Sequence, residues 1–165
     1  MLDKKIIEDV LYAALSRGGD FAEIFLEDKY NANMRMVGGI LENNISGKDY
    51  GVGIRILDKY NSIYAYTNDS SEANLIKVAK EVSLALKSSR QDIVLNLMKS
   101  PVHNINPIKI VPSSVDKSKK IQLLKRGYES AKNYDELITQ VTANYFDEEQ
   151  NVLIANTEGL IAEDK

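Results

Sequence analysis

The chain of 165 residues contains no cysteine, no tryptophan and only one histidine. The absence of cysteine excludes disulfides, thiol catalysis and cysteine-bound zinc within these residues. The single histidine, His103, stands in the loop-like segment Ser100-Pro-Val-His-Asn104. One histidine without neighbouring ligands does not make a metal site, so we interpret it as a surface residue. We therefore expect this chain to hold no catalytic set and no metal.

The sequence also lacks long apolar runs and a strong excess of either charge. No run approaches the roughly 20 apolar residues that a membrane-spanning helix needs. The N-terminal residues carry acids within an apolar pattern, which is typical of a helix and not of a signal peptide. A cytoplasmic location is therefore expected by elimination. The formal net charge is −3, which disfavours binding to nucleic acid or to an anionic membrane.

What is present is the composition of an ordinary globular domain. Hydrophobic residues make up 44% and charged residues 27% of the chain, and its length suffices for one domain with a core. Helical periodicity predicts three helices, over residues 3–16, 72–87 and 117–133. Asp69 and Glu72 have the spacing of a capping box at the start of the second helix. The third helix is expected to bury Ile121, Leu124, Tyr128 and Ala131.

Alternating apolar residues predict several strands that are separated by short turns. The expected strands lie over residues 21–28, 34–37, 40–45, 50–57, 62–66, 137–146 and 152–156. A polar turn is expected at residues 147–151, and residues 160–165 look like the first half of another strand. Residues 88–114 hold all three prolines and are interpreted as an internal connection, with a short edge strand at 108–111.

Short turns between neighbouring strands imply antiparallel pairing. The fold class that we predict is α+β, with a largely antiparallel sheet and about three helices. A helix followed by a hairpin occurs at both ends of the chain, which suggests an internal duplication. Because the last strand looks incomplete, we expect residues 1–165 to be the front part of a longer protein.

The most distinctive local motif is Gly51-Val-Gly53-Ile-Arg55. As a phosphate-binding loop it fails, because Ile56 occupies the place of the third glycine and no helix follows. Glycines within a strand more often mark a place where another group approaches the backbone closely, and we favour that interpretation. Whether Arg55 is structural or contacts a ligand stays open.

Two tyrosines lie on one face at the end of the next strand, in Tyr64-Ala-Tyr66-Thr-Asn68. Tyrosine at a half-buried edge suits an interface or a peptide groove, and it suits an ordinary sheet equally well. The acids Glu23 and Glu27 share a strand face, but four residues separate them by about 13 Å. A paired acid–base site is therefore not expected there.

A run of basic residues marks the third helix and consists of Lys117, Lys119, Lys120, Lys125 and Arg126. Such a run is one way to bind nucleic acid or an acidic partner. No aromatic residues interleave with it and the chain as a whole is acidic, so we favour a solvated helix face.

Four segments, in this order, resemble a known family. They are Gly19-Asp-Phe-Ala-Glu-Ile-Phe-Leu-Glu27, Tyr50-Gly-Val-Gly-Ile-Arg-Ile56, Tyr64-Ala-Tyr-Thr-Asn-Asp69 and Val152-Leu-Ile-Ala-Asn-Thr-Glu-Gly159. Together they span essentially the whole chain, and they are similar to the N-terminal domain of the TldD/PmbA (TldE) proteins, also called modulators of DNA gyrase. The second and third segments look closer to the TldD branch.

The resemblance implies a zinc metallopeptidase that degrades or processes unfolded or extended peptides. In that family the TldD subunit pairs with TldE. It holds zinc through an H-E-x-x-x-H motif and a further cysteine, and the glutamate activates the metal-bound water. None of these residues is present here. The resemblance therefore implies that residues 1–165 are a non-catalytic N-terminal domain, inactive alone, and that a missing C-terminal part holds the zinc.

Within that picture the domain shapes the substrate passage or the subunit interface. We expect Arg55, Tyr64, Tyr66 and Asn68 to contact peptide or partner, because an extended peptide can add to the edge of a sheet. The expected partners are a peptide substrate in the full-length protein and a TldE-like or identical subunit, with no membrane and no nucleic acid. The alternative is a non-catalytic protein-binding module of the gyrase-modulator type, which the basic run on the third helix would support.

Overall fold

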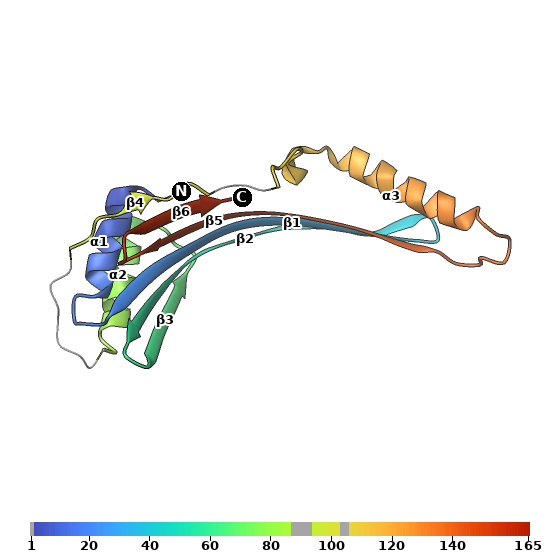
Figure 1. Ribbon diagram of the computed structural model, residues 1–165. Coiled ribbons are helices and arrows are strands. Elements are labelled where there is room, and N and C mark those ends of the chain that lie inside the picture. The colour runs from blue at the N-terminus through green and yellow to red at the C-terminus, as the bar shows by residue number, and fades with distance from the viewer. Residues whose placement is uncertain (1, 87–93, 103–105) are drawn as a thin grey trace. The chain divides into compact units, whose positions relative to one another are not determined.

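The computed structural model describes residues 2–86, 94–102 and 106–165. Figure 1 shows the elements in this part of the chain. They are, in order, α1 (Lys4–Ala14), β1 (Phe21–Val37), β2 (Ile40–Asp58), β3 (Asn61–Thr67), α2 (Glu72–Ser83), β4 (Met98–Lys99), the 3-10 turn η1 (Pro112–Ser114), α3 (Lys117–Lys132), β5 (Thr142–Asn156) and β6 (Leu160–Asp164).

The described strands form one six-stranded sheet with the order β3-β2-β1-β5-β6-β4. β2 and β3 pair antiparallel, and so do β5 and β6, whereas the two-residue β4 runs parallel to β6. The predicted α+β class is therefore confirmed. None of the helices in the described ranges is long and apolar enough to cross a membrane. His103, which the sequence places in a surface loop, lies outside the described residues.

The chain divides into two compact units. The first unit consists of Met1–Asp28, Tyr50–Asn104 and Asn151–Lys165, and the second consists of Lys29–Asp49 and Ile105–Gln150. Strands β1, β2 and β5 are each divided between the two units, so that one part of each strand belongs to the first unit and the other part to the second. Each unit has a hydrophobic core of its own, and each is described by itself below.

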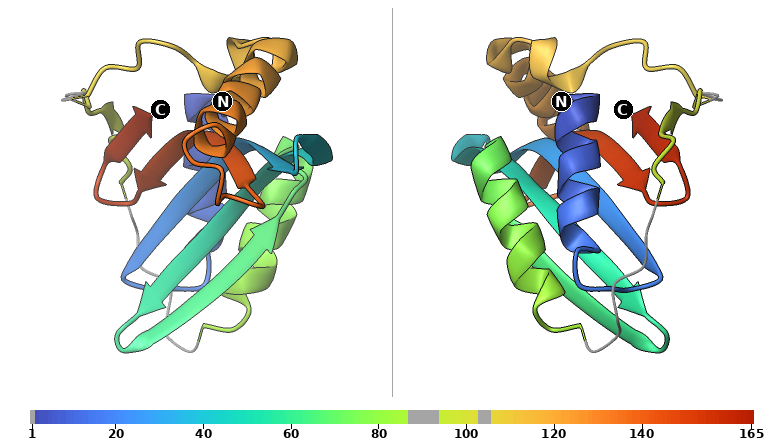
Figure 2. Two further views of the ribbon diagram at one scale, coloured as in Figure 1. Left: turned by 90° about the vertical axis from the view of Figure 1, so that its right-hand side faces the viewer. Right: turned by 90° about the vertical axis from the view of Figure 1, so that its left-hand side faces the viewer.

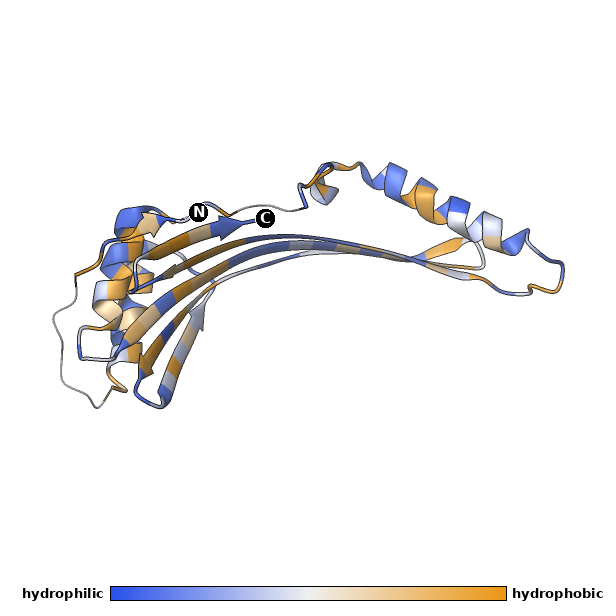
Figure 3. Ribbon diagram, in the orientation of Figure 1, coloured by the Kyte–Doolittle hydropathy of each residue, from blue (hydrophilic) through white to orange (hydrophobic). Residues whose placement is uncertain are grey.

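In the first unit α1 and α2 lie on the same face of the sheet (Figure 2). Both helices are amphipathic, and their apolar stripes cover the apolar side of the strands. Ile7 and Leu75 of the helices and Ile24 and Ile54 of the strands are almost completely buried in this core. Figure 3 shows apolar residues alternating with polar ones along these strands. Burial is therefore one-sided, and no helix of the described first unit covers the opposite face.

An N-cap at the start of α1 and a glycine turn before β1 fix the first segment of this core. Asp3 caps α1, and its carboxylate accepts a hydrogen bond from the backbone N–H of Lys5 at 2.8 Å. Gly19 then turns the chain into β1 with a φ of +100°. A Cβ at this position would lie 2.9 Å from side-chain atoms of Leu15 and Ile56, so only glycine fits. Helix α1 ends at Ala14, two residues before the end of the predicted helix at residue 16, and Gly18 and Gly19 follow with positive φ angles.

In the second unit β1 and β2 meet in a hairpin turn at Gly38 and Gly39, whose φ angles are +57° and +83°. Two successive positive φ angles are typical of a two-residue hairpin loop. Helix α3 packs on this unit through a small core of Met34, Met36 and Leu124. Partly buried residues surround that core, namely Leu41, Ile121, Tyr128, Ala143 and Tyr145.

The sequence underestimates the length of the first strands. Residues 21–28 and 34–37 belong to one strand, β1, and residues 40–45 and 50–57 belong to one strand, β2. The polar stretches within them carry little apolar alternation. Pairing with neighbouring strands keeps these stretches extended, because strand formation follows context more than intrinsic propensity.

The predicted turn at residues 147–151 is wrong. Strand β5 runs without interruption over Thr142–Asn156, so the predicted strand at 137–146 also begins too early. The turn that follows β5 lies at residues 157–159, where Gly159 has a φ of +98°. The charges in Asp147-Glu-Glu-Gln-Asn151 suggest a loop. The Asp147 side chain is nevertheless buried in the second unit, where its carboxylate forms an ion pair with the buried Lys120.

Three smaller predictions are also wrong. Helix α2 has no capping box, because its N-cap is Ser71, and the carboxylate of Asp69 accepts the backbone N–H of Ser71 at 2.9 Å. No strand forms at residues 108–111, and the short strand of this connection is β4, which adds to β6. Ala131, expected to face inward on α3, is exposed.

Candidate functional site

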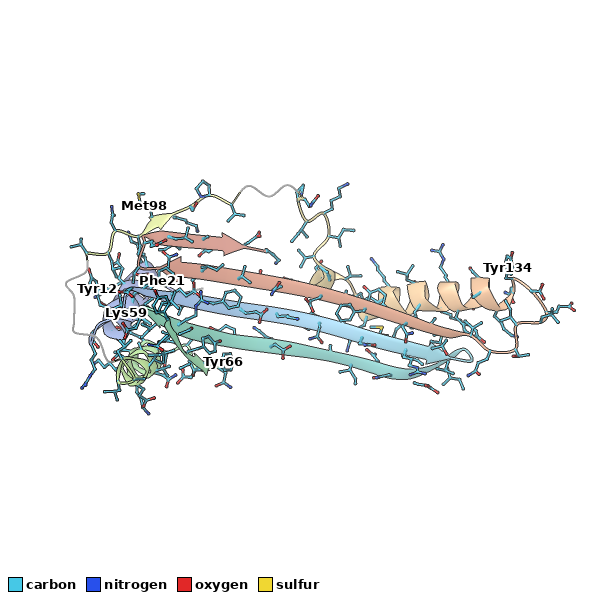
Figure 4. The ribbon with its side chains drawn as sticks, turned by 60° about the horizontal axis from the view of Figure 1, so that its bottom comes forward. Tyr12, Phe21, Lys59, Tyr66, Met98 and Tyr134 are labelled. Carbon is cyan, nitrogen blue, oxygen red and sulfur yellow. The ribbon has the colours of Figure 1, made fainter. Side chains whose placement is uncertain are left out.

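The candidate site is the face of the first unit's sheet that lies opposite α1 and α2. Side chains alternate along each strand, so the residues between the buried ones point to this face. On β1, β2 and β3 these residues are Phe21, Glu23, Phe25, Gly51, Gly53, Arg55, Tyr64 and Tyr66. We call this set the tyrosine face. Its two tyrosine side chains are 60% and 62% exposed, and Figure 4 labels Phe21 and Tyr66.

Each tyrosine of this face lies over a glycine of the neighbouring strand. The register places Tyr64 opposite Arg55 and Tyr66 opposite Gly53, and both rings lean diagonally along β2. A Cβ added to Gly53 would lie 2.5 Å from the hydroxyl of Tyr64, and one added to Gly51 would lie 2.1 Å from the ring of Tyr66. The glycines of the Gly-x-Gly motif are therefore close-approach positions, as the sequence indicates.

A hydrogen bond and an ion pair position the polar groups of the tyrosine face. The hydroxyl of Tyr66 donates to the carbonyl oxygen of Tyr50 at 3.1 Å. The guanidinium Nη2 of Arg55 lies 2.7 Å from Oε1 of Glu23 on the neighbouring strand. The Arg55 side chain is 44% exposed, so this pair contributes at most about 1 kcal/mol to stability. The guanidinium has five N–H donors, and its exposure leaves part of them directed to solvent.

Hydrogen bonds at the start of α2 hold the end of β3 in place beside this face. The Thr67 hydroxyl oxygen accepts hydrogen bonds from the backbone N–H of Asp69 at 3.1 Å and from the side-chain amide of Asn74 at 3.0 Å. Hydrogen bonds from Ser71 lower the pKa of the Asp69 carboxyl below its ordinary value. Asn68 lies within this tight segment, one residue beyond β3, and is exposed.

Three of the four predicted site residues therefore share one surface. Arg55, Tyr64 and Tyr66 lie on the tyrosine face, whereas Asn68 follows the end of the strand. That they contact peptide or partner stays a prediction. Sequence reasoning missed that Glu23 positions Arg55, although the opposite charges on the exposed faces of two strands are a usable signal.

The tyrosine face presents aromatic, hydroxyl and guanidinium groups, and the described residues bring no set of metal ligands together. No group of three or more histidine, aspartate or glutamate side chains in the described residues is placed to hold a metal ion. The ligands of a metallopeptidase zinc site are histidine, cysteine or carboxylate, and the chain has one histidine and no cysteine. The residues present therefore do not fit a zinc site. Aromatic faces pack against apolar groups, and hydroxyl groups and a guanidinium form hydrogen bonds.

The basic run on α3 is smaller in the structure than in the sequence. Lys120 is not solvated, because its side chain is only 4% exposed and its Nζ lies 2.6 Å from the Asp147 carboxylate. Lys125 pairs with Glu129 one helical turn away. The solvated-face interpretation is thus wrong for Lys120, and the run that is left for an acidic partner consists of Lys117, Lys119 and Arg126.

Comparison with known protein families identifies the chain. Residues 22–86 match the family described as PmbA/TldA metallopeptidase domain 1, and residues 110–165 match the PmbA/TldA metallopeptidase central domain. The chain therefore belongs to the TldD/PmbA family. A Metalloprotease TldD homolog of Haemophilus influenzae is 29% identical over 154 residues, which are 90% of this chain and 31% of that protein.

Solved structures show the same fold. A proposed modulator of DNA gyrase from Bacteroides thetaiotaomicron matches with a TM-score of 0.76 and 19% identity, over 98% of this chain and 38% of that chain. TldE from Thermococcus kodakarensis matches with a TM-score of 0.65 and 12% identity, over 96% and 36%. The chain thus spans about a third of the length of its relatives. The extent of a single N-terminal domain over residues 1–165, with 88–114 as an internal connection, stays a prediction.

Proposed function

We propose that this chain is a non-catalytic, peptide-handling part of a TldD-type metallopeptidase, and that the tyrosine face contacts the extended peptide. The observation that carries this proposal is the pair of exposed tyrosines seated over Gly51 and Gly53. Zinc and the residues that activate its water are supplied from outside this sequence, because the residues present do not fit a metal site.

The physical case rests on what such a face recognises. Tyrosine offers a large apolar ring and a hydroxyl, and it loses little conformational entropy on contact because it has two side-chain torsions. The rings on this face are already held over the glycines, and the Tyr66 hydroxyl is hydrogen-bonded. Pre-organised contacts reduce the entropy that binding would otherwise lose. A face of this kind accepts many peptide sequences, as a degrading or processing enzyme requires.

Photo-crosslinking tests the proposal. Benzoyl-phenylalanine replaces Tyr66 in one variant and the 85%-exposed Tyr134 of the second unit in a control. Each is irradiated with reduced, carboxymethylated insulin B chain, which is an unstructured polypeptide. We expect an adduct from the Tyr66 position and little from the Tyr134 position. Equal labelling at both positions, or labelling at Tyr134 alone, would contradict the proposal.

The alternative function is a non-catalytic binding module of the kind that the gyrase-modulator description of the Bacteroides structure suggests. Its support in this chain is the basic surface of α3, now reduced to Lys117, Lys119 and Arg126. Salt-sensitive binding of duplex DNA or of an acidic polypeptide, abolished in Lys117→Glu/Lys119→Glu, would favour this alternative. Unchanged binding in that variant would exclude α3 as the contact.

A further inference from the structure

A pocket lies where the C-terminal ends of α1 and α2 meet. The two helices lie side by side on one face of the first unit's sheet (Figure 2). Ser16, just beyond α1, and Ser83, the last residue of α2, bring their hydroxyl oxygens within 3.3 Å of each other. The hollow beside this contact has a volume of about 580 Å³, which is within the roughly 300–1,000 Å³ of small-molecule sites. We call it the helix-end pocket, and besides the two serines it is lined by Arg17, Ile76, Lys77, Lys80, Glu81 and Leu84.

Hydrogen bonds between the helix ends hold the inner wall of the pocket. The Ser83 side chain is buried, and its hydroxyl donates to the carbonyl oxygen of Lys80 at 2.7 Å. The 3.3 Å between the two serine hydroxyls is long for a bond of this type. The half-buried Ser16 hydroxyl can therefore turn towards a ligand in the pocket.

The helix-end pocket is positively charged within an acidic chain. The described residues that line it include three basic side chains and one acidic one, a formal charge of +2, whereas the whole chain carries −3. Lys77 and Glu81 lie 3.9 Å apart and are mostly exposed, so their pairing is weak. Arg17 and Lys80 are exposed and form no ion pair with another described residue. The C-terminal end of a helix favours basic side chains in any case, so the charge defines a site only together with the hollow beside it.

Apolar side chains line the same pocket. Ile76 is half-buried, and Leu84 is 59% exposed. A guanidinium binds a carboxylate through two parallel hydrogen bonds, and a second cation adds to the attraction. The Glu81 carboxylate in the lining disfavours a dianion such as phosphate, which also has no apolar part.

We propose that the helix-end pocket binds a carboxylate joined to a branched apolar group, as in the last residue of a peptide or in a short free acid. Arg17 and Lys80 hold the carboxylate, and Ile76 and Leu84 contact the apolar group. This inference goes beyond the proposed function, because the pocket lies on the helix side of the sheet, opposite the tyrosine face.

NMR of the chain with labelled isoleucine and leucine methyl groups tests this site, because Ile76 and Leu84 report from the pocket itself. The probe is N-acetyl-alanyl-leucine, and the control is its C-terminal amide, which has the same apolar groups without the charge. We expect the acid to shift both methyl signals and to bind at least about tenfold more tightly than the amide, which has no carboxylate to pair with the two cations. The free acid 4-methylpentanoate shows whether the peptide bond adds to the affinity. Tighter binding of the acetylated dipeptide assigns the pocket to a peptide terminus, and tighter binding of 4-methylpentanoate assigns it to a free acid.

A pair of charge-removing variants gives a second measurement. Arg17→Gln/Lys80→Gln should bind the acid about tenfold more weakly and the amide as before. The matched control Lys119→Gln/Arg126→Gln removes the same two charges from exposed positions of α3 and should bind as the unaltered chain does. Equal affinity of the unaltered chain for acid and amide would overturn the proposal, and so would inorganic phosphate that binds as tightly as the acid. Methyl signals of Ile76 and Leu84 that do not move with any probe would also overturn it.

Discussion

At the scale of single residues, the second unit is fixed by a buried polar cluster. The Asp147 carboxylate oxygen Oδ2 accepts the Tyr145 hydroxyl at 2.6 Å and pairs with Lys120 Nζ at 2.6 Å. The Lys120 ammonium also lies 5.9 Å from the centre of the Tyr145 ring. The Lys120 and Asp147 side chains are only 4% and 9% exposed, so removing either charge leaves the other buried and unpaired.

We predict that Lys120→Met destabilises the chain by about 3 kcal/mol, because the Asp147 carboxylate loses its counter-charge in a buried place. Urea denaturation measures this free energy. The control is Lys119→Met, which changes an exposed neighbour on the same helix and should have an effect below about 0.5 kcal/mol. Equal effects of the two substitutions would mean that the buried pair does not hold α3.

Tyr145 makes the same cluster sensitive to alkaline pH. Burial, together with the hydrogen bond to Asp147 and its negative charge, raises the pKa of Tyr145 from 10.0 to about 12. The folded state holds the phenol proton more tightly than the unfolded state does. The stability from this difference is complete below pH 10 and is lost as the pH rises towards 12. In Tyr145→Phe the unfolding free energy should fall less steeply over this window. Parallel curves for both proteins would contradict the assignment.

At the scale of elements, the sequence predicts those helices and strands whose formation depends on residues close together in the chain. Helical periodicity predicts α1 to within two residues of its end, and the strands predicted on either side of residues 38 and 39 are separated there by a turn. The site is predictable in part for the same reason, since Arg55, Tyr64 and Tyr66 stand at alternate strand positions.

Elements that depend on distant partners are not predictable in this way. The sequence around Asp147 predicts a turn, because the residues beside it in the chain do not show that its side chain packs against Lys120 and Tyr145. The opposite charges of Glu23 and Arg55 at exposed strand positions favour a pair, but the alignment of β1 with β2 brings the two side chains together. Asp69 and Glu72 have the spacing of a capping box, but Ser71 takes the cap position.

A single-residue insertion distinguishes the continuous β5 from the turn that the sequence suggests. Glycine inserted between Glu148 and Glu149 moves every side chain on one side of it to the other face of the strand. We predict a destabilisation of about 2 kcal/mol, measured by thermal or urea unfolding. The same insertion between the exposed Asp135 and Glu136, before β5, should be tolerated. If both insertions are tolerated, β5 is not continuous.

At the scale of the whole molecule, the chain belongs to a metallopeptidase family, and the residues that the structure describes bring no set of metal ligands together. The chain spans about a third of the length of its relatives. In the proposed function, this part contacts the peptide, and residues outside this sequence carry out the cleavage. The exposed tyrosines of the first unit carry this account.

The most direct test of the account is the affinity of the chain for fluorescein-labelled, carboxymethylated insulin B chain, measured by fluorescence anisotropy. We predict that Tyr64→Ser/Tyr66→Ser binds at least about tenfold more weakly, since each tyrosine lost from a contact costs about 1 kcal/mol or more. Tyr60→Ser/Tyr134→Ser, which removes two exposed tyrosines outside the tyrosine face, should bind as the unaltered chain does. Equal affinity of all three proteins, each shown to be folded, would contradict the central claim that the tyrosine face holds the peptide.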